Sequence, residues 1–147
     1  MVDYKRLLFT IIICEAAGIA GSLITTIGPW YDQLIKPWFN PPSWVFGPVW
    51  TTLYLMMGVA LYLIWEDKDA RTAFWIQLGL NAIWTPIFFG FRQIELAAVE
   101  IIILWIAILI TIRRSYKVNK TASYLLIPYL VWVSFAAILN ISLAVLN

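Results

Sequence analysis

The chain has 147 residues, of which 63% are hydrophobic and 12% charged, with a formal net charge of +2. So few charged residues cannot cover the surface of a soluble domain of this size, and the composition therefore indicates an integral membrane protein. The absence of histidine removes the usual haem and zinc ligand and the usual general base. The single cysteine excludes an intrachain disulfide. The small, scattered positive charge gives no support to a nucleic-acid partner.

Five segments are apolar over about the 20 residues that a helix needs to cross the hydrocarbon core. They comprise residues 7–27, 45–65, 72–91, 96–112 and 122–146. We therefore predict an all-α membrane protein with a single domain over residues 1–147, a bundle of five transmembrane helices with a long Pro/Trp-rich loop between the first and the second. Lys5 and Arg6 precede the first apolar run, as in a cleaved signal peptide, but the run continues to Ile27, which favours a retained helix.

The basic residues are distributed unequally between the two sets of loops. Lys36 and Arg92 fall on one side of the predicted membrane. The other side holds Lys5, Arg6, Lys68, Arg71, Arg113, Arg114, Lys117 and Lys120. Since short cytoplasmic loops carry the excess of Lys and Arg, we predict a cytoplasmic N-terminus, with the aromatic loop and the C-terminus outside.

The first loop and the start of the second segment read WYDQLIKPWFNPPSWVFGPVWTTLY (residues 30–54), a concentration of aromatic rings and prolines. Pro37, Pro41 and Pro42 lack a backbone donor and favour extended neighbours, so we expect a stiff, non-helical lid. Trp and Tyr also favour the lipid headgroup region, and an interfacial aromatic belt explains part of the pattern.

Rings continue into the predicted helices at helical spacing, which places them on one face of each helix. One such face is often ordinary helix packing, but three faces beneath a proline-rich loop favour a cavity lined by rings. The three sets are Phe46, Trp50 and Tyr54; Gln77, Asn81, Trp84 and Phe88; and Trp132, Ala136 and Asn140, with Phe135 alongside.

Two carboxyl groups fall within the predicted spans, where an ionisable group is costly to bury. Glu100 is close enough to the predicted outer end of its helix to be interfacial. Glu15 is deeper, so we expect it to be protonated, paired or in contact with a wet cavity. A lone glutamate in a first helix also occurs in small proton-coupled exporters, which makes transport one of the functional hypotheses.

Three stretches carry a resemblance to a known family: WYDQLIKPWFNPPSWVFGPVWTTLYLMMG (30–58), QLGLNAIWTPIFFG (77–90) and PYLVWVSFAAILN (128–140). In this order they resemble the TspO/MBR family of tryptophan-rich sensory and translocator proteins, also called peripheral-type benzodiazepine receptors. The resemblance covers nearly the whole chain, including its length and the place of the long loop. It implies a five-helix bundle, a homodimer, and a bacterial or archaeal cell membrane as the location.

The resemblance also implies a pocket for porphyrins such as protoporphyrin IX and for benzodiazepine-site ligands, with the porphyrin as ligand and with no obligatory cofactor or metal. Some relatives promote light- and oxygen-dependent breakdown of protoporphyrin with two pocket tryptophans, which correspond here to Trp50 and Trp132. The implied ligand-binding residues are Tyr31, Pro42, Phe46, Trp50, Tyr54, Asn81, Trp84, Phe88, Trp132, Ala136 and Leu139.

The chain departs from family patterns in two places. Animal relatives carry a proposed cholesterol motif near the end of the fifth helix, with a tyrosine followed by a basic residue, and LNISLAVLN (139–147) has neither. Sterol recognition through that motif is therefore not expected. Thr85 stands one turn after Asn81, where some relatives have asparagine, so the hydrogen bonds offered to a ligand differ.

Three functional hypotheses result. The leading one is a membrane receptor or sensor that binds porphyrin and regulates tetrapyrrole metabolism or a stress response, with Lys36 as the nearest cation for a propionate. The second is photo-oxidative degradation of the porphyrin. Because the sequence offers no conventional acid–base pair, nucleophile or metal site, such catalysis would use the photochemistry of the porphyrin itself. The third is proton-linked transport. Small residues mark two candidate dimer faces, with Gly79 and Ala82 on the third predicted helix and Ala16, Ala20 and Gly21 on the first. The resemblance favours the third helix.

Overall fold

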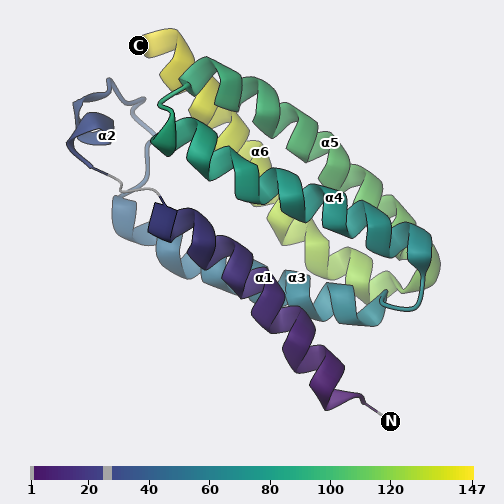
Figure 1. The fold of residues 1–147 in the computed structure, drawn as a ribbon. Helices are drawn as coiled ribbons and strands as arrows, with labels where there is room; N and C mark the ends of the chain where they lie inside the picture. The colour runs from purple at the N-terminus through teal and green to yellow at the C-terminus, as the bar shows by residue number, and fades with distance from the viewer. Residues whose placement is uncertain (1, 25–27) are drawn as a thin grey trace.

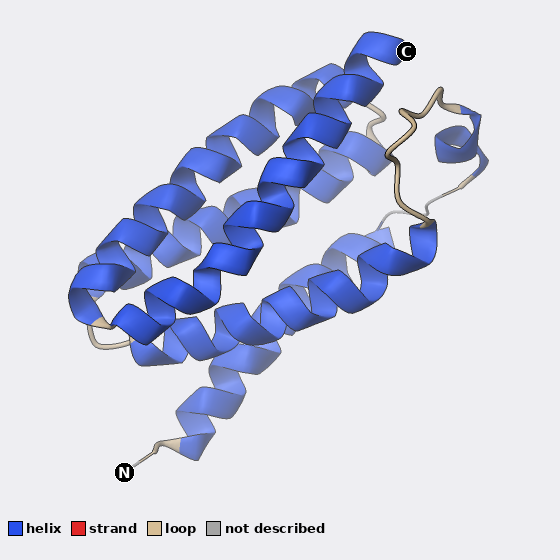
Figure 2. Cartoon of the chain, turned by 180° about the vertical axis from the view of Figure 1, so that it is seen from behind, coloured by secondary structure: helices blue, strands red, loops and turns tan. Residues whose placement is uncertain are grey.

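The chain folds into a bundle of long helices in the computed structural model, which describes residues 2–24 and 28–147 (Figure 1). The long helices are α1 (Tyr4–Ile24), α3 (Phe46–Leu63), α4 (Lys68–Thr85), α5 (Ile94–Val118) and α6 (Lys120–Leu146). Shorter elements are α2 (Pro29–Gln33), the 3₁₀ turn η1 (Ser43–Val45) and the π-helical turn η2 (Pro86–Gly90). Since the described ranges contain no strand, as Figure 2 also shows, the all-α prediction is confirmed.

Local capping explains two of the sharp connections. Asp67 begins α4 by accepting a hydrogen bond from the backbone N–H of Ala70 at 2.8 Å. Asn119 lies between α5 and α6, and its side chain accepts from the N–H of Ala122 at 3.1 Å. A side-chain cap of this kind satisfies a backbone donor that the first helical turn leaves free. Both connections are short, so α3 and α4 run antiparallel, as do α5 and α6 (Figure 1).

Four helical segments are long and apolar enough to cross a membrane by length and composition: Tyr4–Leu23, Ser43–Leu63, Ile94–Val118 and Lys120–Leu146. The helix α4 is not among them, because it begins four residues before the apolar segment predicted at 72–91. Its first turns therefore include the charges of Lys68, Asp69 and Arg71. Residues 25–27 of the predicted first span lie outside the described residues.

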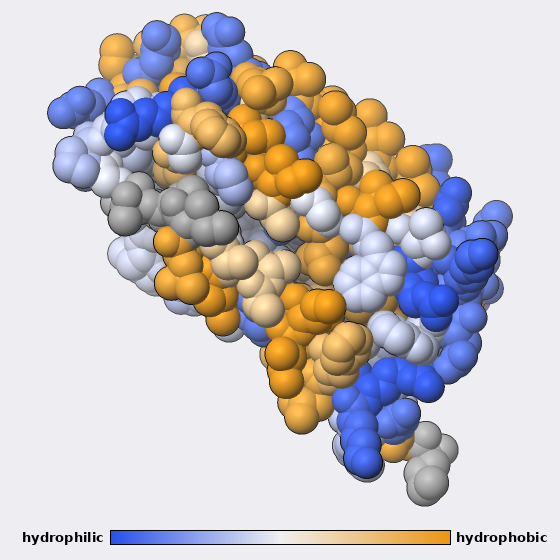
Figure 3. Space-filling model, viewed as in Figure 1, coloured by the Kyte–Doolittle hydropathy of each residue, from blue (hydrophilic) through white to orange (hydrophobic). Residues whose placement is uncertain are grey.

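The surface matches a membrane environment. Figure 3 shows hydrophobic side chains across the middle of one face and hydrophilic side chains gathered toward both ends of the bundle. Large apolar side chains such as Leu23, Val131 and Val145 are more than half exposed. Exposed apolar side chains in a band between two polar ends are what a lipid-facing surface requires.

The segment from residue 28 to residue 45 contains more regular secondary structure than a single loop. It contains α2 and η1, which the proline pattern did not predict, while residues 34–42 contain no helix. Asn147 binds both backbone groups of Ile35, accepting from its N–H at 2.8 Å and donating to its carbonyl at 3.0 Å. The Tyr31 hydroxyl donates to Asn40 at 3.1 Å, and the Tyr31 ring is buried. The segment is therefore tied to the end of the bundle where α6 ends.

Helix α1 approaches α3 closely at one point. A Cβ atom added to Gly58 would lie 2.6 Å from the Cα atom of Ile11, so this contact requires glycine. Gly58 itself is buried in α3. Because the two helices meet here at backbone distance, small residues at this position let α1 pack against α3.

Candidate ligand-binding cavity

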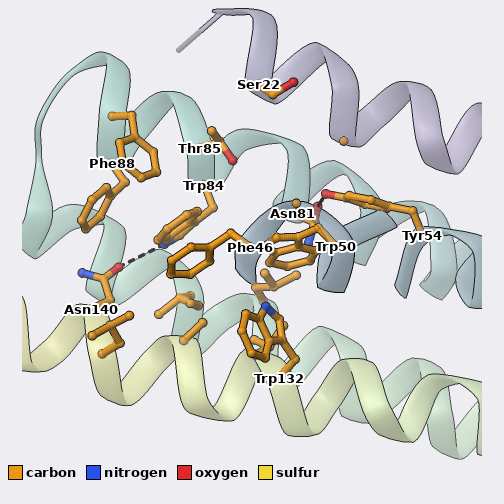
Figure 4. Close-up of a pocket in the computed structure, with 18 of the residues that line it drawn as sticks. Ser22, Phe46, Trp50, Tyr54, Asn81, Trp84, Thr85, Phe88, Trp132 and Asn140 are labelled. Carbon is orange, nitrogen blue, oxygen red and sulfur yellow. Dashed lines mark hydrogen bonds between the residues drawn. The ribbon is translucent and has the colours of Figure 1, made fainter. Parts of the chain in front are cut away.

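A cavity of about 590 Å³ lies inside the bundle, bordered by α1, α3, α4, α5 and α6 and by Tyr31 of α2. Figure 4 shows Phe46, Trp50, Trp84 and Trp132 around it, contributed by three different helices. Small-molecule sites in proteins commonly have volumes of about 300–1,000 Å³ and apolar, aromatic walls. The cavity therefore has the size and lining of a ligand site.

The α3 wall consists of Phe46, Trp50 and Tyr54, which recur every four residues and so face the cavity together. Trp50 stacks on Tyr54, with ring centroids 5.5 Å apart and planes 28° from parallel. Phe46 meets the Trp132 ring of α6 edge-on at 6.0 Å. This wall therefore presents rings that are already held by other rings.

The second wall lies where α4 continues into η2. Pro86 has no backbone N–H, and its carbonyl accepts from the N–H of Phe91 at 2.8 Å, a bond across five residues. The wide turn that results brings both Phe88 and Phe89 to the cavity, together with Trp84. Trp84 stacks on Phe88 with ring centroids 5.1 Å apart. Such π-helical turns are frequently found at functional sites.

The α6 wall contains Trp132, Ala136, Leu139 and Asn140. The Trp84 indole N–H donates to Asn140 Oδ1 at 3.0 Å (dashed in Figure 4), and Asn140 Nδ2 donates to the Ile94 carbonyl at 3.0 Å. Asn140 therefore joins α4, α5 and α6 at the cavity. The indole Nε1 of Trp132 is buried and has no hydrogen-bond partner within the described structure.

A second polar bridge crosses the bundle beside the cavity. The Tyr54 hydroxyl donates to Asn81 Oδ1 at 2.5 Å, and Asn81 Nδ2 donates to the Tyr129 hydroxyl at 3.0 Å. Tyr54, Asn81 and Tyr129 are all buried. The bridge satisfies polar groups from α3, α4 and α6 inside the protein, so it orients the rings around the cavity.

Helix α1 supplies the fourth wall with Glu15, Gly18, Ile19 and Ser22. These positions follow the spacing of three and four residues that defines one face of a helix. A Cβ atom on Gly18 would clash with the Tyr54 ring, so glycine makes room for that ring. This wall was not among the implied binding residues, although the same spacing rule would have found it.

The structure brings together ten of the eleven residues that the resemblance implied as ligand-binding, since all except Pro42 line the cavity. Pro42 instead precedes η1 at the exposed end of the loop. Among the other members of the predicted faces, Asn140 lines the cavity, whereas Gln77 is buried away from it without a hydrogen-bond partner in the described structure. Phe135 packs against Trp132, with ring centroids 5.4 Å apart.

Lys36 does not line the cavity. Its ammonium lies 4.8 Å from the centroid of the Tyr31 ring and donates to the Asp32 carbonyl at 3.1 Å. Burial raises the pKa of the Tyr31 hydroxyl, so this residue is a neutral donor to Asn40 near neutral pH. Lys36 is therefore engaged with the loop. Among the described residues, no group of three His, Cys, Asp or Glu side chains is placed to hold a metal ion.

Comparison with known proteins gives consistent matches. Residues 10–146 match the TspO/MBR family. The chain is 42% identical to the tryptophan-rich protein TspO of Archaeoglobus fulgidus, over 99% of both chains. It is 34% identical to the tryptophan-rich sensory protein of Cereibacter sphaeroides, over 99% of this chain and 94% of the relative. It is 42% identical to the human translocator protein, over 76% of this chain and 70% of the relative.

Proposed function

The chain belongs to the TspO/MBR family and is a multi-pass integral membrane protein, and from this premise we propose that it is a receptor or sensor for porphyrins such as protoporphyrin IX. The site would also accept benzodiazepine-site ligands, and occupancy would regulate tetrapyrrole metabolism or a stress response. The names of the relatives, a sensory protein and a translocator protein, support this role.

The observation that carries the proposal is the arrangement of rings around one cavity. Trp50 and Trp84 each stack on a neighbouring ring and lie on different helices, and Trp132 lies on a third. A tetrapyrrole is a broad, flat π-surface, and aromatic side chains stabilise such surfaces by offset stacking or edge-to-face contact. The cavity therefore supplies contacts to the faces and the edges of a macrocycle.

Quenching of tryptophan fluorescence by protoporphyrin IX in the dark tests the proposal. We expect saturable quenching by the wild type, and weaker binding by Trp50→Phe and Trp132→Phe, because each substitution reduces the ring area at the cavity. Trp105→Phe is the matched control, since Trp105 donates to Ser134 at 2.8 Å and does not line the cavity. Equal affinity in all four proteins would remove the assignment of this cavity.

Photo-oxidative degradation of the bound porphyrin is the second candidate function. Trp50 and Trp132 line the same cavity, and the Trp132 indole N–H has no competing partner in the described structure. An indole beside an excited porphyrin can quench it or be oxidised, so the chemistry would depend on light and oxygen. Repeating the titration under illumination separates binding from turnover in one sample.

Proton-linked transport is the third candidate, favoured by the carboxyl group of Glu15 at the cavity wall. Porphyrin flux in proteoliposomes should then respond to a pH gradient and fall in Glu15→Gln. Flux that ignores both would reject transport while leaving binding intact.

The membrane arrangement belongs to the same proposal. We infer that α4 with η2 forms a fifth transmembrane segment beside the four apolar ones, with the N-terminus cytoplasmic and residues 28–45 outside. We also infer a homodimer that pairs through α4. Ile76, Gly79 and Ile83 are exposed on that helix, and a Cβ added at Gly79 would meet nothing within 4 Å. Crosslinking of cysteines placed at Gly79 and, as control, at Ile102 of α5 tests the pairing.

A further inference from the structure

Glu15 lies on the cavity-facing side of α1, which it shares with Gly18, Ile19 and Ser22. Its side chain is half-buried, and among the described residues that line the cavity Glu15 is the one that carries a carboxyl group. A carboxyl group in a membrane-spanning helix is costly, and such groups generally face a wet cavity or a partner of opposite charge.

No positive partner for Glu15 exists in the described part of the protein. The ion pairs there join Arg6 to Asp3 and to Glu66. Arg6 precedes Glu15 by nine residues on the same helix, which corresponds to about 14 Å along its axis. Cys14 precedes Glu15 on α1, and Tyr54 of α3 packs against Gly18 of the same helix, and neither is a cation.

Glu15 lines the same cavity as the aromatic rings of α3. The Tyr54 ring packs against Gly18, one turn from Glu15, and Trp50 stacks on Tyr54. An ammonium group is attracted to an aromatic face, and the attraction strengthens when both are removed from water. A cavity that holds both a carboxyl group and these rings therefore has the chemistry of a site for an organic cation.

We propose that the cavity binds a second class of ligand, a flat aromatic ring that carries an ammonium group, with the ring between Trp50 and Trp84 and the cation at Glu15. This inference rests on the proposal that the cavity is the ligand site, but not on the ligand being a tetrapyrrole. Glu15 then determines selectivity by charge, while the rings determine selectivity by shape.

Two probes of the same shape test the inference: (naphthylmethyl)trimethylammonium and its uncharged isostere, neopentylnaphthalene. Their dissociation constants are measured by calorimetry with wild type and Glu15→Gln in an uncharged detergent. Partition of each probe into detergent is the same for both proteins, so it cancels when the variants are compared. We expect Glu15→Gln to weaken the ammonium probe by about tenfold or more and the neutral probe by less than about twofold.

Glu95→Gln is the matched control, because Glu95 is an exposed carboxylate in the first turn of α5 and does not line the cavity. It should bind both probes as the wild type does. Retained binding of the neutral probe shows that Glu15→Gln is folded. Equal weakening of both probes, or unchanged binding of the ammonium probe, overturns the inference.

A separate protoporphyrin titration keeps the two proposals distinguishable. Loss of ammonium selectivity in Glu15→Gln, together with no porphyrin binding by any variant, supports the cation site and rejects the tetrapyrrole. Porphyrin binding, together with no effect of Glu15→Gln on the ammonium probe, supports the tetrapyrrole and rejects the cation site.

Discussion

The Tyr54 hydroxyl donates to Asn81 Oδ1 at 2.5 Å, and this bond joins α3 to α4 beside the cavity. Asn81 passes the connection to α6 by donating to the Tyr129 hydroxyl at 3.0 Å. Trp50 stacks on Tyr54, so the orientation of the Trp50 ring depends on an amide in another helix. The polar bridge therefore fixes the shape of the aromatic walls.

Replacing Asn81 by leucine should destabilise the protein. Both tyrosine hydroxyls would lose their amide partner in a buried site, and an unsatisfied buried polar group costs about 1–3 kcal/mol. Thermal unfolding in detergent, followed by near-UV circular dichroism, should show a lower midpoint and a changed aromatic signal. An unaltered midpoint would mean that the bridge contributes nothing to stability.

Gln77 provides the control for that experiment, because it lies one turn before Asn81 on the same helix. It is fully buried, and neither of its amide atoms has a hydrogen-bond partner in the described structure. Gln77→Leu removes an unsatisfied amide and keeps a similar volume, so we expect unchanged or increased stability. If Gln77→Leu lowers the unfolding midpoint as much as Asn81→Leu does, the loss of stability does not come from the hydrogen bonds of Asn81.

Gly18→Ala should disturb both stability and binding. The added methyl group would clash with the Tyr54 ring, and overpacking of this kind costs about 1–3 kcal/mol. Moving that ring also displaces the Trp50 face. We expect a lower unfolding midpoint and weaker quenching by protoporphyrin.

Gly79→Ala is the matched substitution within one chain, since nothing in that chain lies within 4 Å of the added atom. Because we infer that Gly79 lies on the dimer face, the unfolding midpoints are compared for monomers in detergent. Alanine favours helix over glycine by about 1 kcal/mol, so this variant should be at least as stable as the wild type. If Gly18→Ala and Gly79→Ala change the unfolding midpoint alike, the effect of Gly18→Ala does not come from the close approach of Gly18 to Tyr54.

How far the sequence predicts this site depends on the kind of signal. Spacing of four residues places Phe46, Trp50 and Tyr54 on one face, because helical geometry is local and regular. The π-helical turn at Pro86 changes that register, so the contribution of Phe89 does not follow from ideal helical spacing. Pro42 lies in a motif of the family but does not line the cavity, because the path of a loop, unlike the face of a helix, does not follow from regular spacing.

The ends of the helices and the contacts between helices follow less directly from the sequence than the residues that share one face of a helix. The charges of Lys68, Asp69 and Arg71 indicated a connection between helices, but Asp67 caps a helix that begins at Lys68. Glu15 was recognised as costly from its type and depth. Its place on the cavity wall follows from the packing of α1 on α3, a contact that one sequence does not specify.

Asn147→Ala should loosen the segment over the end of the bundle. The Asn147 side chain makes two hydrogen bonds to the backbone of Ile35, at 2.8 and 3.0 Å. Each such bond contributes about 1 kcal/mol net, so losing both should raise amide hydrogen exchange in residues 34–42 by about tenfold or more. Peptides from α3 report on the bundle and should exchange as in the wild type. Equal acceleration in both regions would indicate general destabilisation instead.

Light should distinguish Trp50 and Trp132 from the other rings of the cavity. Phenylalanine keeps an aromatic face but is much harder to oxidise than tryptophan, so Trp50→Phe and Trp132→Phe should retain part of the dark affinity and lose most of the light-dependent conversion of protoporphyrin. Phe88→Leu reduces ring area without removing an indole, so it should weaken binding and leave conversion per bound porphyrin unchanged. Absorbance of the porphyrin under illumination, normalised to the bound fraction, measures this quantity. If conversion per bound molecule is the same in all three variants and equals that of porphyrin in empty detergent, the protein holds the pigment and takes no part in its breakdown.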